Sequence, residues 1–71
     1  MKLSYDPEAD AAYVQVAPHI EPGAVVRSEE TSYLDCHIAV DYDSDDRVLG
    51  IEILSASTLF TPTALDVAGS E

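Results

Sequence analysis

Short runs of apolar residues, several of them alternating with polar ones, are separated by turn-forming residues along the whole sequence. β-Branched and aromatic residues concentrate in these runs, and the spacing between turns is too short for long helices. Asp, Pro, Gly and Ser cluster at 6–10, 18–23, 29–35 and 43–46, where turns are expected. The pattern therefore predicts five strands, at Lys2–Tyr5, Ala12–Val16, Ala24–Ser28, Cys36–Tyr42 and Val48–Leu54.

The connections between these strands are short and hairpin-like, which favours antiparallel pairing of neighbours in a meander-like sheet. In the first hairpin, a register that opposes Leu3 with Val14 and Tyr5 with Ala12 places the apolar side chains on one face. The predicted fold class is mostly β: a single antiparallel sheet of about five short strands, with a short C-terminal helix or irregular tail.

Two registers of the last hairpin place its apolar side chains on one face equally well. A two-residue loop, 44–45, opposes Val40 with Leu49, whereas a four-residue loop, 44–47, opposes Val40 with Ile51. Both registers stay open.

The stretch from Ser55 to Glu71 differs in character from the preceding strands, and the predicted division is a β domain at 1–57 and a tail or short helix at 58–71. Thr61 fits a helix N-cap and Pro62 the first helical position. Leu65 and Ala68 would then form one apolar stripe over a helix that ends at Gly69. Leu59 and Phe60 are expected to dock on the apolar sheet face, which a homodimer would cover equally well.

Composition narrows the function classes. The 71 residues carry 3 basic and 14 acidic side chains and a formal net charge of −11. Such a charge disfavours nucleic acid and anionic membranes as partners. A chain this short buries a small core, so self-association is expected. The single Cys36 and the lack of a signal peptide predict a cytoplasmic protein.

A metal-binding pattern occurs in the last hairpin. Asp41, Asp43, Asp45 and Glu52 have the spacing of a calcium-binding loop, but Asp46 stands where that loop needs glycine. Glu52 also falls within a predicted strand, too far along the sheet to share a metal ion with Asp41. A solvated acidic turn is the favoured interpretation, with a weak divalent-metal site of Asp41, Asp43, Asp45 and Asp46 as the alternative.

Catalytic motifs are weak, and no cofactor is expected. Cys36 and His37 are adjacent, so in a strand they point to opposite faces and cannot form a nucleophile–base pair. Cys36 is expected to be buried and His37 to be an exposed partner of Glu52 or Asp35. Asp41, His37 and Glu52 share a sheet face, which leaves a small enzyme as a second alternative.

The acidic turns favour an interaction surface. Fourteen carboxylates serve solubility, but grouped in turns they also form an electrostatic docking surface for a basic protein. The favoured hypothesis is a non-enzymatic module that binds such a partner. The expected docking residues are Asp6, Glu8 and Asp10 in the first turn and Asp41, Asp43, Asp45 and Asp46 in the last.

Both hairpins resemble a known family. The segments 5–14 and 40–57 resemble the opening and the close of the small prokaryotic domain of unknown function numbered 2283. The family often has glycine where this chain has Asp46, which affects the expected turn type. The resemblance implies a compact β-rich domain, and some family members are encoded beside small toxin-like proteins. It therefore suggests an antitoxin-like role.

Overall fold

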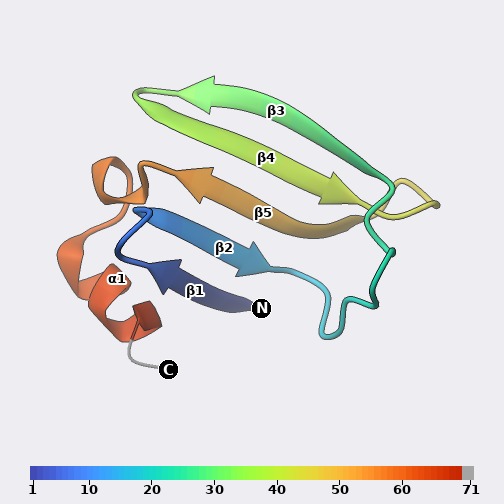
Figure 1. Cartoon of the computed structure of the whole chain (residues 1–71), viewed down its shortest axis with the longest axis horizontal. Helices are drawn as coiled ribbons and strands as arrows, with labels where there is room; N and C mark the ends of the chain where they lie inside the picture. The colour runs from blue at the N-terminus through green and yellow to red at the C-terminus, as the bar shows by residue number, and fades with distance from the viewer. Residues whose placement is uncertain (70–71) are drawn as a thin grey trace.

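The computed structural model describes residues 1–69 of the chain. A single antiparallel sheet is followed by a short 3-10 helix and one α-helix, packed at one end of the sheet (Figure 1). The predicted mostly β fold class is confirmed. The elements are β1 (Lys2–Asp6), β2 (Ala11–Gln15), β3 (Arg27–Tyr33), β4 (Cys36–Tyr42), β5 (Val48–Leu54), η1 (Ala56–Thr58) and α1 (Pro62–Gly69).

The strand order is β1-β2-β5-β4-β3, so β2 pairs with β5 and the expected pairing of β2 with β3 is wrong. The connection 16–26 runs past the ends of β5 and β4 to reach the outer edge (Figure 1). At about 4.8 Å per strand it crosses about 14 Å, which this length allows. Its length and its prolines, Pro18 and Pro22, suit a crossing loop better than a tight hairpin turn.

The third strand lies later than its pattern predicted. A strand at Ala24–Ser28 and a turn at 29–35 were expected, but β3 covers Arg27–Tyr33 and only Leu34 and Asp35 form the turn. Every residue of β3 is exposed, so burial imposes no apolar alternation on the strand. Its polar sequence therefore resembles that of a loop.

The registers of both predicted hairpins are now defined. Leu3 opposes Val14 as predicted, and Val40 opposes Ile51, which is the register of the longer-loop alternative and excludes the two-residue loop. The loop itself is shorter than 44–47, because the Asp43 amide donates to the Arg47 carbonyl oxygen at 2.9 Å. Near the turn a β-bulge places Tyr42 opposite Val48 and leaves Leu49 as the extra residue.

The core lies on one face of the sheet, at the end where the helix packs. Cys36 is 1% exposed, as predicted for a small apolar residue, and its thiol donates to the Ser55 carbonyl oxygen at 3.4 Å. Half-buried Leu3, Tyr5, Val14, Ile38, Ile51 and Phe60 pack against this centre. The buried cluster consists of Ala12, Cys36, Ile53, Ala56 and Leu65.

The C-terminal segment forms the predicted helix. The Ala64 amide donates to the Thr61 hydroxyl oxygen at 3.2 Å, which confirms the N-cap. Leu65 and Ala68 are buried, and α1 packs against β1. Phe60 joins the core as expected, whereas Leu59 stays 37% exposed. Residues 70–71 of the predicted tail lie outside the described part of the chain.

The molecule is thin, with principal dimensions of 35 × 27 × 17 Å. It exposes 4803 Å² of surface, about a tenth more than a compact monomer of its mass. Within residues 1–69, the one α-helix packs at one end of one face of the sheet, and the other face carries no helix.

Candidate acidic docking surface

The open face of the sheet carries mainly polar side chains. Residues directly opposite each other in an antiparallel sheet share a face, so the pairings define three rows. In the paired strands, the carboxylates of this face are Asp6, Glu30, Asp41 and Glu52, and its basic side chains are Lys2 and His37. The central row is Ser4, Tyr13, Glu52, Ala39 and Glu30. The rows on its two sides are Lys2, Gln15, Gly50, Asp41 and Ser28, and Asp6, Ala11, Leu54, His37 and Ser32.

Tyr13 crosses this face from β2 to β4. Its hydroxyl donates to Asp41 Oδ2 at 3.0 Å, and the Ser28 hydroxyl donates to Oδ1 of the same carboxylate at 2.6 Å. Gly50 of β5 lies between them, and a β-carbon there would overlap with the phenol ring. Partial burial of the ring, followed by its hydrogen bond to Asp41, raises the pKa of Tyr13 to about 12. Gly50 therefore lets one tyrosine join three strands.

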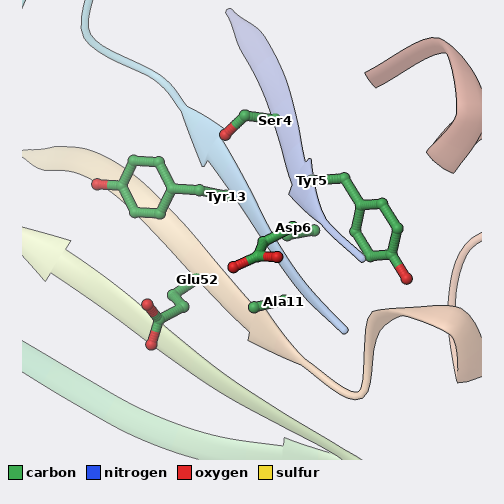
Figure 2. A pocket seen from close by; sticks show the side chains of 7 residues that line it. Ser4, Tyr5, Asp6, Ala11, Tyr13 and Glu52 are labelled. Carbon is green, nitrogen blue, oxygen red and sulfur yellow. The ribbon is translucent and has the colours of Figure 1, made fainter. Parts of the chain in front are cut away.

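A shallow pocket of about 370 Å³ opens beside the Tyr13 ring. Figure 2 shows the carboxylates of Asp6 and Glu52 near Ala11, extending from the strands on either side of β2, and the Tyr13 ring also lines the pocket. The Glu52 carboxylate accepts no hydrogen bond within the described residues, and the Asp6 carboxylate accepts one, from the Glu8 amide at 3.0 Å. Both carboxylates therefore keep most of their capacity to bind a cation.

The three residues of the enzyme hypothesis share the open face but belong to separate groups. His37 Nε2 lies 2.8 Å from Glu30 Oε1, so its partner is Glu30 and the predicted pairing with Glu52 or Asp35 is wrong. Asp41 is engaged by Tyr13 and Ser28. Glu52 opposes Ala39, which separates His37 from Asp41 along β4.

In the first acidic turn, one of the three expected docking residues has an internal role. Asp10 accepts hydrogen bonds from the Ser57 amide at 3.0 Å, the Ser57 hydroxyl at 2.7 Å and the Tyr5 hydroxyl at 2.7 Å. These bonds, with the Ser57 hydroxyl first, lower the pKa of Asp10. Asp10 therefore ties the first turn to η1, while Asp6 and Glu8 remain exposed.

The last acidic turn is held together by its own residues. Asp43 Oδ1 accepts from the amides of Asp45 and Arg47 at 2.8 and 3.0 Å, and the Arg47 bond in particular lowers the pKa of Asp43. Asp46 pairs with Arg27 at 3.0 Å. Within residues 1–69, no three His, Cys, Asp or Glu side chains are grouped so as to hold a metal ion.

The two expected docking groups lie at opposite ends of the sheet (Figure 1). The turn 7–10 lies beside η1, and the turn 43–47 lies beside the crossing loop. A single partner that contacted both groups would therefore have to span the length of the sheet. Tyr13, Gly50 and Ser28 were not singled out from the sequence, although a glycine inside an apolar strand is a signal of close side-chain approach.

These features define a class of small β proteins: a five-stranded antiparallel sheet with a helix on one face and an open, acidic second face. Residues 2–57 match the family described as Protein of unknown function (DUF2283), and the chain belongs to that family. No curated protein and no solved structure matches the chain. None of the helices described in residues 1–69 is long and apolar enough to cross a membrane.

Proposed function

We propose that this protein is a binding module that docks a basic partner protein against the open acidic face of its sheet. The observation that supports this function is the pocket between Asp6, Tyr13 and Glu52. It combines two carboxylates that keep free oxygen lone pairs with an aromatic wall, in a face that no helix covers.

The pocket has the chemistry that a lysine or arginine side chain requires. The aliphatic stem of such a side chain packs against the Tyr13 ring and Ala11, while its charged end lies between the two carboxylates. The net charge of −11 steers a basic protein toward this face from about a Debye length away. A small basic toxin is one partner of this chemistry, so an antitoxin-like role belongs to the same proposal.

The experiment is affinity capture with the tagged full-length chain from its native cells, at low and high salt. The Asp6→Lys/Glu52→Lys variant reverses the charge of the pocket. Glu21→Lys/Asp66→Lys is the matched control, because it makes the same change in net charge at exposed positions outside the pocket and outside both acidic turns.

We expect one basic protein to co-elute in stoichiometric amount and to be released by salt. The pocket variant should lose it, and the control should keep it. Equal losses in both variants would show that net charge alone matters and would remove the pocket from the proposal. Absence of any basic protein in the eluate would overturn the function.

The predicted homodimer and the weak divalent-metal site stay predictions. Sedimentation over a range of concentrations checks the first. Calorimetry with calcium, magnesium and zinc checks the second.

A further inference from the structure

Strand β3 forms an open edge of the sheet. It is the last strand in the order and has only β4 as a neighbour, and all seven of its residues are exposed. The other edge, β1, is five residues long and packs against α1. The longer and less covered edge is therefore β3.

The hydrogen-bond pattern identifies which backbone groups of β3 are free. Val16 donates to the Leu49 carbonyl oxygen at 2.9 Å, and these residues continue the register of β2 and β5. Inward and outward amides alternate along each strand of an antiparallel ladder. The observed pairings extend this alternation from β5 through β4 to β3. In β3, the N–H and C=O groups of Ser28, Glu30 and Ser32 therefore point away from β4.

Nothing in the backbone blocks this edge. Proteins commonly guard open edges with proline, bulges, lysine or short strand length. β3 contains no proline, spans seven residues and pairs with β4 without a register shift. Its guards are Glu29 and Glu30.

These two charges select between possible strands. If two copies of β3 paired about their centres, the two Glu30 side chains would lie opposite each other, in a complex of two chains of charge −11. A basic strand would meet no such repulsion. The edge is thus protected against its own copy and open to a strand of opposite charge.

We propose that β3 binds an extended basic segment of the partner protein, which adds to the sheet as a sixth strand. The outward N–H and C=O groups of Ser28, Glu30 and Ser32 would form the new ladder. This inference rests on the proposed function, since it assigns the partner a binding mode.

The side chains of β3 specify the segment further. Glu29 and Glu30 lie on opposite faces of the sheet, so two consecutive basic residues of the added strand would each lie beside one carboxylate. Glu29 pairs with Arg27 and Glu30 with His37, but the two glutamate side chains remain 62% and 66% exposed. At the end of the strand, Tyr33 is 59% exposed and Leu34 is 70% exposed, which provides an apolar contact beyond the basic pair.

The test uses the full-length chain and a blocked synthetic peptide of about nine residues, with two lysines flanked by alternating valine and threonine. Ser32→Pro removes one outward N–H and leaves the ladder to β4 intact, whereas Ser32→Ala keeps that N–H. Titration calorimetry should show salt-sensitive binding that weakens at least about tenfold in Ser32→Pro and less than about twofold in Ser32→Ala. Circular dichroism confirms the fold of each variant.

A second comparison needs no protein variant, and it decides the question if Ser32→Pro fails to fold. Two further peptides of the same sequence carry methyl groups on the amide nitrogens of either the odd-numbered or the even-numbered residues. One of the two should bind the unchanged chain at least about tenfold more weakly than the unmethylated peptide. Salt-sensitive binding that neither proline nor methylation weakens would overturn strand addition.

Two other outcomes also overturn it. In the first, the peptide does not bind, but native cells still yield a salt-released basic protein whose capture requires the pocket. This result would overturn strand addition and leave the proposed function standing. A dimer that forms in the unchanged chain and is lost in Ser32→Pro would assign the edge to a second copy.

Discussion

The two ends of the sheet are built on different principles. At the helical end, which comprises the turns 7–10 and 34–35, η1 and α1, side chains distant in the sequence meet in a buried cluster. At the loop end, which comprises the segments 16–26 and 43–47, Asp43 caps its own turn and Arg27 pairs with Asp46 in solvent. Buried packing thus holds one end, whereas exposed polar contacts hold the other.

Asp10 and Asp43 show the same contrast with one residue type. Asp10 reaches Ser57, 47 residues away in sequence, whereas Asp43 accepts from amides two and four residues away. Both carboxylates are engaged within the protein, which removes them from the set available to a partner. Acidic residues near a turn are therefore not interchangeable, and the docking surface has to be found among the carboxylates that the fold leaves free.

The largest effect is expected from shortening the apolar side chains of β5. Ile53, 3% exposed, lies at the helical end, and Ile51 lies two residues nearer the loop end on the same face and is only half-buried. Ile53→Ala should lower the free energy of unfolding by about 3 kcal/mol, and Ile51→Ala by about 1 kcal/mol. Urea denaturation measures both, and equal losses would show that the two ends are equally packed.

A smaller effect is expected from the tyrosine that ties β2 to β4. Tyr13→Phe removes the hydrogen bond to Asp41 and keeps the ring over Gly50, which should lower stability by about 1 kcal/mol. The exposed Tyr33→Phe is the matched control and should change stability by less than about 0.5 kcal/mol.

The pH dependence tests the same bond. The pKa of Tyr13 is raised from 10.0 to about 12, so the folded state holds its proton more tightly than the unfolded state. The resulting stability is fully present below pH 10.0 and is lost as the pH rises toward 12. Tyr13→Phe should remove this part of the alkaline slope, measured by urea midpoints at increasing pH. An unchanged slope would contradict the assigned bond.

The sequence predicted the elements whose apolar residues are buried. Leu3 with Val14 and Val40 with Ile51 face one core, so the alternation that identified their strands also limited their registers. No such constraint acts on β3, which lies at an edge with both faces exposed. The strand order could not be predicted from the sequence either, because the pattern does not reveal that the segment 16–26 crosses past two strands.

The acidic site was predictable in composition and not in geometry. The excess of carboxylates over basic side chains is plain in the sequence, but which of them are free depends on tertiary contacts such as Asp10 with Ser57. The pocket wall formed by Tyr13 depends on the pairing of β2 with β5, which places Gly50 beneath the ring. A local pattern cannot contain that pairing.

The smallest effect is expected at the loop end, where Asp46 adopts a left-handed backbone with φ of 60°. Glycine reaches this conformation without a steric penalty, and the exposed pair with Arg27 contributes little. Asp46→Gly should therefore raise the free energy of unfolding by about 0.5 kcal/mol. Alanine tolerates the left-handed conformation less well than aspartate, so Asp46→Ala should be about 1 kcal/mol less stable than the unchanged chain.

The difference between these two variants separates backbone conformation from charge. If backbone conformation limits the stability of this turn, glycine and alanine move the urea midpoint in opposite directions. If both variants lower it equally, the Arg27–Asp46 pair holds the turn despite its exposure. The loop end would then depend, like the helical end, on a contact between distant residues, and the contrast between the two ends would rest on burial alone.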